Sequence, residues 1–334
     1  MKHNLPVQKQ PMMRTVIVGL LPAVIASIYF YGWVSMGILL LSVLTCIITE
    51  WLFARSMKCK VTEASVVTGI LFALVLPPTI PIYMVIIGAA FGITFGKMAF
   101  GGFGCNVFNP ALTGRCFIYI TFPIHMTARW VPAANFSDFP GGFAAWRFLP
   151  LSGKLSALTT ATPSHAYRAG AEKLPDLLQL VLGNINGSFE KLGETLFIGG
   201  GVLGEGSAVL LILGGLYIVY KKAAKWRLVV SFLSVYTIVQ IILHSLVPEL
   251  SPPLFYGLFS GGVFLAVFFM ITDPVSAPKT SAAQLLYGSL IAVVGQIIKT
   301  FSLFAGGIMF AILIGNMFAP LMDHTVRYFK RNQK

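Results

Sequence analysis

The chain alternates between long apolar blocks and short polar connections. Each block runs for roughly 17–22 residues, close to the ~20 that cross a hydrocarbon core as a helix. An outer-membrane barrel would instead show short segments of alternating polarity. The pattern therefore predicts an all-α, polytopic membrane protein. Its ten predicted spans are 15–35, 37–54, 65–80, 82–97, 107–124, 205–220, 228–247, 255–272, 283–299 and 303–322.

Composition excludes the soluble classes of protein. Of 334 residues, 56% are hydrophobic and only 10% are charged, and the mean hydropathy is +0.82. A soluble domain is about 25% charged. The net charge of +13 would suggest nucleic acid in a soluble chain. Here the lysines and arginines stand between the apolar blocks, so we interpret them as signals of membrane orientation.

The basic clusters alternate along the chain in the way that the positive-inside rule requires. If the N-terminus is inside, every cluster next to a short connection falls on the cytoplasmic side, so both termini are predicted to be cytoplasmic. These clusters are Lys2, Lys9 and Arg14; Arg55, Lys58 and Lys60; Lys97; Lys221, Lys222, Lys225 and Arg227; and Arg327, Lys330, Arg331 and Lys334.

The spans divide into two halves of five helices, at 1–124 and 205–334, around an extracytoplasmic segment at 125–204. A repeat of this kind would be related by inverted topology. GILFALVLP at 69–77 echoes GVFLAVFF at 262–269, and both runs lead into proline, which predicts broken helices that line a cavity. The outer segment contains PGGFAAWRFLP at 140–150, which we expect to form an ordered, functional flap.

No catalytic constellation is visible. The five histidines are scattered without metal-ligand spacing, and the chain has neither a Walker loop nor a GxGxxG that opens a helix after a strand. Nucleotide hydrolases and Rossmann oxidoreductases are therefore not expected. No catalytic residue and no resident metal are predicted.

The first stretch with chemical potential is FGGFGCNVFNPALTG at 100–114. Its glycines permit close approach of the backbone to a flat ligand. Asn109 followed by Pro110 is typical of the N-cap and first residue of a helix. Asn106 and Asn109 carry amides that both donate and accept, so they can also read the polar edge of a heterocycle.

Two further stretches contain candidate site residues. TTATP at 159–163 is either a threonine-rich turn or a site that another enzyme modifies, since no base is near in sequence to activate a hydroxyl. ITDPVSA at 271–277 places Asp273 at a membrane margin, where Glu50 and Asp323 also lie. These acids either snorkel or cap helices, or they form a site for a transported cation or proton.

Four motifs in this order resemble one family: VTGILFALVLPPT at 67–79, FGGFGCNVFNPALTGR at 100–115, TTATP at 159–163 and FFMITDPVSA at 268–277. The chain is similar over nearly its whole length to two sister proteins. One is NqrB, a membrane subunit of the Na+-translocating NADH:quinone reductase. The other is RnfD, a membrane subunit of the Rnf ion-translocating ferredoxin:NAD+ oxidoreductase.

The resemblance implies two flavins. FMN is joined through a phosphoester to the last threonine of the family's S-G-A-T motif by a dedicated flavin transferase. That residue is Thr162 here, although Thr159 and Thr160 replace the serine and glycine. A noncovalent riboflavin is implied near Asn106 and Asn109.

The resemblance also implies a place in a multi-subunit redox complex of the bacterial inner membrane. Electrons would pass from a periplasmic flavoprotein subunit to FMN and then to riboflavin, coupled to Na+ or H+ transport. Glu50 and Asp323 match two acids linked to Na+ uptake in the quinone reductase. Besides these subunits, the transferase and membrane lipid are the expected partners.

The two sisters are separated by weaker signals. The first predicted span starts at about residue 15, and KKAAKWRLVVSFL at 221–233 also favours the Rnf protein. NPALTGRCFIYITFP at 109–123 is closer to the quinone reductase, which stays the alternative. The transported ion and the terminal acceptor are left open. A secondary transporter or channel without flavin, and a structural subunit without cofactor, are the alternatives from other classes.

Overall fold

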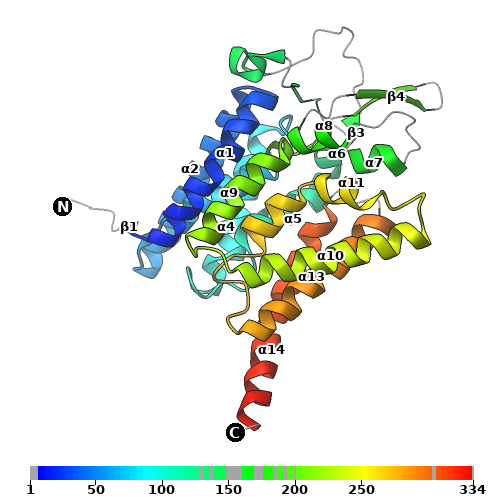
Figure 1. The fold of residues 1–334 in the computed structure, drawn as a ribbon. Helices are drawn as coiled ribbons and strands as arrows, with labels where there is room; N and C mark the ends of the chain where they lie inside the picture. The colour runs from blue at the N-terminus through cyan, green and yellow to red at the C-terminus, as the bar shows by residue number, and fades with distance from the viewer. Residues whose placement is uncertain are drawn as a thin grey trace.

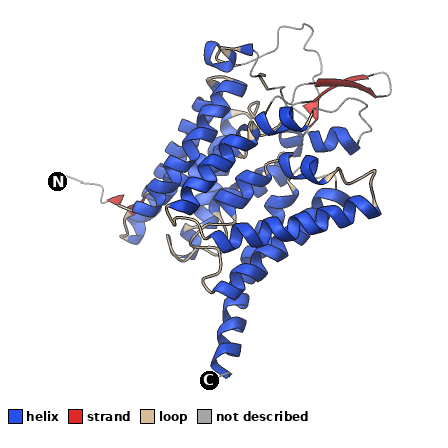
Figure 2. Ribbon diagram, viewed as in Figure 1, coloured by secondary structure: helices blue, strands red, loops and turns tan. Residues whose placement is uncertain are grey.

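The structure is a computed structural model, and helices dominate it (Figure 2). It describes residues 7–127, 131, 133–135, 138–147, 160–161, 163–168, 176–183, 187–191, 194–198, 201–302 and 306–332. Residues 159 and 162, in the TTATP motif, lie outside these ranges. The three-stranded sheet lies at one end of the molecule and the C-terminal end of α14 at the other (Figure 1).

Each predicted span has a helical counterpart, which confirms the all-α polytopic fold. The first half contains α1 (Pro11–Tyr31), α2 (Val34–Met57), α3 (Ala64–Leu74), α4 (Ile82–Gly96) and α5 (Pro110–Thr121), followed by the short α6 (Pro123–Thr127). The second half contains α9 (Ala208–Tyr220), α10 (Trp226–Leu246), α11 (Leu254–Phe259), α12 (Val263–Leu265), α13 (Ser281–Phe301) and α14 (Gly307–Asn332).

Six helices of the described chain are long and apolar enough to cross a membrane: α1, α2, α4 with the turn that follows it, α10, α13 and α14. The other spans are shorter or broken. In the first half α2 packs on α4 and α4 on α5, and in the second half α10 packs on α13 and α13 on α14. These helix pairs correspond between the two halves. The inverted topology of the halves stays a prediction, and so do the domain boundaries at 124 and 204.

Helix α2 shows why the bundle suits a membrane. Its outward face carries Leu40, Leu44, Ile48 and Leu52 at four-residue spacing, each more than half exposed. Its inward face carries Ser42 and Glu50, both almost fully buried. A helix with apolar residues outside and polar residues inside is stable in lipid and unstable in water.

Helix α3 ends at Leu74 because Pro77 and Pro78 follow. Proline lacks an amide hydrogen and disfavours helical backbone in the residue before it. The irregular segment is buried in protein, where the Leu203 amide donates to the Leu76 carbonyl at 3.0 Å. Non-helical backbone at membrane depth needs such shielding from lipid.

The eighth span is broken more sharply than the sequence predicts. Gly261 and Gly262 adopt φ values of +79° and +67°, which separate α11 from α12. Only glycine takes this conformation at low cost. A π-helical turn, η5 (Ala266–Met270), follows and leads into Thr272 and Asp273. π-Helical turns occur frequently at functional sites.

The outer segment contains regular structure that the sequence pattern did not reveal. It includes two short helices, α7 (Pro163–Arg168) and α8 (Leu177–Leu182). It also contains a sheet in which β5 (Glu194–Ile198) pairs with β3 (Thr160–Ala161) in parallel and with β4 (Gly187–Lys191) in antiparallel fashion. Residues 141–147 dock on the α1–α2 turn, where Val34 donates its amide to the Trp146 carbonyl at 2.7 Å. This part of the predicted flap is therefore ordered.

Candidate functional site

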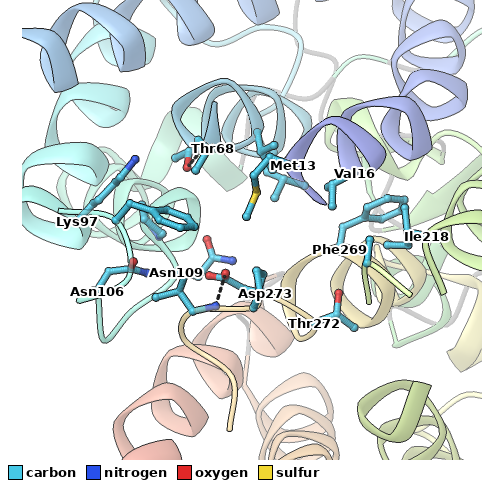
Figure 3. Close-up of a pocket in the computed structure, with 18 residues that line it drawn as sticks. Met13, Val16, Thr68, Lys97, Asn106, Asn109, Ile218, Phe269, Thr272 and Asp273 are labelled. Atoms are coloured by element: carbon cyan, nitrogen blue, oxygen red, sulfur yellow. Dashed lines mark hydrogen bonds between the residues drawn. The ribbon is translucent and has the colours of Figure 1, made fainter. Parts of the chain in front are cut away.

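A cavity lies among the start of α1, the start of α3, the end of α9 and the η5 turn, beside the loop before α5 (Figure 3). Its volume is about 50 Å³, well below the ~300–1,000 Å³ typical of small-molecule sites, so it would have to widen to hold a larger ligand. Most of its walls are apolar, and both halves of the chain contribute to them. Its polar side chains are Thr68, Lys97, Asn106, Asn109, Thr272 and Asp273.

Asn109 is the N-cap of α5, as its sequence context predicts. Its Oδ1 accepts hydrogen bonds from the amides of Ala111 at 3.0 Å and Leu112 at 3.4 Å. Since the cap uses the oxygen, the amide nitrogen is the group left for a ligand. Asn109 is only 3% exposed, and it lines the cavity. It therefore offers the cavity a hydrogen-bond donor.

Asn106 offers the cavity a hydrogen-bond acceptor. Its Nδ2 donates to the Phe108 carbonyl at 3.1 Å, which leaves Oδ1 as the acceptor. Asn106 is buried and lies beside Asn109 on the same wall of the cavity in Figure 3. The glycines before it include Gly101 and Gly102 with φ near +100°, so this turn requires residues without a Cβ. The loop thus presents an acceptor and a donor to one ligand.

Asp273 lies in the turn that follows the broken eighth span. Its Oδ1 accepts from the Val275 amide at 3.1 Å, and its Oδ2 accepts from the Ser276 hydroxyl at 2.9 Å. These bonds shape the turn, and the carboxylate also lines the cavity opposite Thr68 (Figure 3). The structure therefore brings Asp273 together with the two asparagines.

Glu50 lies behind the cavity wall in a buried ion pair. Lys97 Nζ donates to Glu50 Oε2 at 2.7 Å, and each side chain is only 2% exposed. Thr62 donates to Glu50 Oε1 from its amide at 3.0 Å and from its hydroxyl at 2.8 Å. Lys97 also donates to the Thr62 hydroxyl at 2.7 Å. Glu50 is thus joined to the cavity through Lys97.

A small parallel bridge holds Thr62 in position. In it β1 (Val7–Gln8) pairs with β2 (Val61–Thr62). The Arg14 guanidinium contacts Glu63 at 2.6 Å, and this hydrogen bond, with a second one from the Gln10 amide, holds the pKa of Glu63 below its usual value. These contacts fix the start of α1 against the start of α3, where both helices line the cavity.

Asp323 does not join this site. Its carboxylate accepts from the amides of Lys279 and Thr280, both at 2.8 Å, and from the Thr280 hydroxyl at 2.8 Å. It thereby caps the start of α13 and lines a separate hollow with His324 and Arg327. The sequence predicts that Asp323 and Glu50 both lie at a membrane margin, but in the structure the two carboxylates belong to different sites.

Thr162, the predicted flavin attachment point, lies outside the described residues. The residues after it are held against α11. The Pro163 carbonyl accepts from the Tyr256 hydroxyl at 3.4 Å, and the hydroxyls of Ser164 and Ser260 share a hydrogen bond. These contacts join the outer segment to the break in the eighth span.

Sequence reasoning missed several buried cations. It treated Lys97 only as an orientation signal, and it gave no role to Lys299, whose ammonium donates to the Tyr236 hydroxyl at 3.0 Å and the Gly257 carbonyl at 2.7 Å. Arg115 is 8% exposed, and its Nε has no hydrogen-bond partner in the described part of the chain. The sequence signal that could have found these residues is a charged side chain within or at the end of an apolar block. Such a charge is costly to place in a membrane, so it indicates a functional residue.

These features define a class: a polytopic helical membrane protein in which broken helices enclose a small cavity next to a buried ion pair. Comparison with known proteins gives the family. The model of the NQR2, RnfD, RnfE family matches residues 4–330, and the chain belongs to this family.

Named relatives come from both branches. The chain is 32% identical to the D-subunit of the ion-translocating oxidoreductase complex of Aliivibrio salmonicida, over 94% of this chain and 92% of the relative. It is 30% identical to the D-subunit of the same complex in Halorhodospira halophila, over 96% and 91%. It is 34% identical to the B-subunit of the Na(+)-translocating NADH-quinone reductase of Ectopseudomonas mendocina, over 83% of this chain but 63% of the relative. The chain is thus a membrane subunit of an ion-translocating oxidoreductase.

Proposed function

We propose that the chain is a flavin-carrying electron-transfer subunit of the Rnf type, with riboflavin in the cavity and FMN on Thr162. Electron transfer through these flavins is coupled to transport of Na+ or H+. The observation that carries the proposal is the acceptor–donor pair of Asn106 and Asn109 on the wall of a mostly apolar cavity.

The residues present fit the riboflavin ring system. Its pyrimidine edge carries an imide N–H flanked by carbonyl oxygens, which is the complement of a free Oδ1 beside a free Nδ2. Phe103 and Phe269 supply aromatic surface, while Val67 and Ile218 supply apolar contact. The cavity, about 50 Å³ in this structure, would have to widen to admit the ring system.

The chain's own residues would bind, orient and shield the cofactor. Asn106 would accept from the ring N–H, and Asn109 would donate to a ring carbonyl. The apolar walls would exclude water, and the buried Lys97 would supply positive charge nearby. Bound flavin supplies the redox chemistry itself, while the protein supplies position and electrostatics.

The covalent FMN on Thr162 is supported by the resemblance and by the surroundings of the motif. The anchoring of Pro163 and Ser164 on α11 supports a flavin that faces the helical bundle. Such an attachment requires a flavin transferase, because the motif has no base of its own. A periplasmic flavoprotein subunit is the proposed electron donor, and the bacterial inner membrane is the proposed location.

The NqrB subunit of the Na+-translocating NADH:quinone reductase is the alternative within the family. The stretch KKAAKWRLVVSFL at 221–233 supports the Rnf type, while a D-subunit at 32% identity and a B-subunit at 34% identity both resemble the chain. A transporter without flavin and a purely structural subunit predict that flavin is absent.

In-gel fluorescence tests the covalent flavin. The wild type and Thr162→Ala are co-expressed with the transferase, denatured and compared, with Thr127→Ala, an exposed threonine outside the motif, as the control. We expect a fluorescent band in the wild type and the control that disappears only in Thr162→Ala. A wild-type band without flavin fluorescence would overturn the assignment of FMN to this motif.

A further inference from the structure

Lys97 belongs to two sites at once. Its ammonium is bonded to Glu50 and Thr62, while its side chain lines the cavity. The same ammonium lies 5.7 Å from the centre of the Phe103 ring, which is also part of the cavity wall. Asp273, on the cavity side, lies close enough to interact with Lys97 electrostatically. One flexible cation therefore has a carboxylate on either side.

The oxygen atoms around the Lys97 ammonium suit a small hard cation as well. They are the two carboxylate oxygens of Glu50 and the hydroxyl oxygen of Thr62, all within the bundle. Oxygen ligands of this kind are preferred by hard metal ions. Glu50 carries one negative charge, so a second cation beside Lys97 would leave a net positive charge buried at high cost. Lys97 and a free cation are thus mutually exclusive at Glu50.

We propose that Lys97 is a tethered cation that competes with the translocated cation for Glu50, and so links that site to the charge in the cavity. The second half of this proposal rests on the proposed function, because it takes the cavity ligand to be a flavin. The first half, competition at Glu50, holds whatever the cavity binds.

The change in charge between the two states balances, with the charge of Asp273 the same in both. With a neutral ligand in the cavity, Lys97 neutralises Glu50. One electron delivered to the cavity by a reduced flavin or iron–sulfur donor adds one negative charge, and Lys97 turns toward that charge and Asp273. One Na+ or H+ then takes the vacated place at Glu50, so one cation enters for each electron. Lys97 keeps its three ammonium protons, and no covalent bond of the side chain is made or broken.

Linkage makes this coupling reciprocal: a cation at Glu50 favours negative charge in the cavity by the same factor. If one cation binds per electron, a tenfold rise in cation concentration raises the midpoint potential of a one-electron step by about 59 mV. Without Lys97, Glu50 binds the cation in both states, and this dependence disappears.

Cation uptake by the oxidised protein tests the competition without relying on flavin. The full-length chain is purified with its partner subunits as wild type, Lys97→Gln, Lys97→Met, Lys97→Gln/Glu50→Gln and the control Lys60→Met, which removes an exposed ammonium. We expect Lys97→Gln to bind 22Na+ at least tenfold more tightly than the wild type, or to gain the infrared band of a protonated carboxyl. Neither gain should occur in the double variant or the control. If the wild type and both Lys97 variants have the same 22Na+ affinity and the same carboxyl infrared band, the proposed competition is refuted.

Reductive titration with dithionite tests the link to the cavity, after flavin content has been measured in each variant. The wild type and Lys60→Met should show a midpoint potential that depends on Na+ or on pH, and Lys97→Gln should show neither dependence. If the wild type contains flavin but its midpoint potential depends on neither Na+ nor pH, the proposed link between Glu50 and the cavity is refuted. A protein without flavin would refute the proposed function and with it the link, while the uptake measurement would still decide the competition.

Discussion

Asn109 has two separable roles, and one substitution isolates them. Its oxygen caps α5, while its amide nitrogen is left to the cavity. Serine is as good an N-cap as asparagine, so Asn109→Ser keeps the helix cap but removes the amide donor. Asn109→Ala removes both functions and serves as the comparison.

The expected magnitudes differ for folding and for ligand binding. Loss of the cap in Asn109→Ala should lower the free energy of unfolding by about 0.5–2 kcal/mol, whereas Asn109→Ser should change it by much less. Asn109 is 3% exposed, so water has little access to replace its donor. A ligand carbonyl left unpaired costs about 1–3 kcal/mol, which weakens riboflavin binding about 5–150-fold in both variants.

The assay measures riboflavin bound per chain and its dissociation constant, by fluorescence quenching, beside a thermal unfolding curve for each variant. We expect Asn109→Ser to unfold like the wild type but to bind riboflavin more weakly. Riboflavin affinity that is unchanged in Asn109→Ser and reduced in Asn109→Ala would show that Asn109 acts only as a cap, and would refute the reasoning.

Two further predictions test the surroundings of the site. Leu44→Lys should impair membrane insertion, since Leu44 is 55% exposed on the lipid-facing side of α2 and a lysine at the centre of a span costs about 2.5–3.5 kcal/mol. A glycosylation reporter measures this against Leu44→Phe, and normal insertion of Leu44→Lys would contradict the lipid-facing assignment. Asp323→Asn should weaken the cap on α13, because the hydrogen bonds to a charged acceptor, about 1.5–3 kcal/mol, are disturbed. Proteolysis near Lys279 should rise while riboflavin content stays constant, and a loss of riboflavin would mean that Asp323 acts on the cavity.

The sequence predicts the helical fold and part of the site because both depend on local signals. Apolar block length predicts the spans, Pro77 and Pro78 predict the end of α3, and the Asn109–Pro110 pair predicts the start of α5. The break at Gly261 and Gly262 was harder to predict, since glycine is common in membrane helices and its left-handed backbone has no separate sequence signal.

The ion pair of Glu50 and Lys97 shows the limit of this approach. The two residues are 47 positions apart: Glu50 belongs to α2, and Lys97 to the turn that ends α4. Periodicity assigns a residue to a face of its own helix, but it does not say which neighbouring helix that face meets. For the same reason Asp323 and Glu50 were grouped by their position at membrane margins, although tertiary packing gives them different partners.

Flavin analysis of the purified wild-type chain tests the central claim most directly. Acid extraction followed by chromatography separates free riboflavin from flavin that stays with the denatured protein. The account predicts one extractable riboflavin and one protein-bound FMN per chain. A pure, folded chain that contains neither flavin would contradict it and would favour a transporter or a structural subunit.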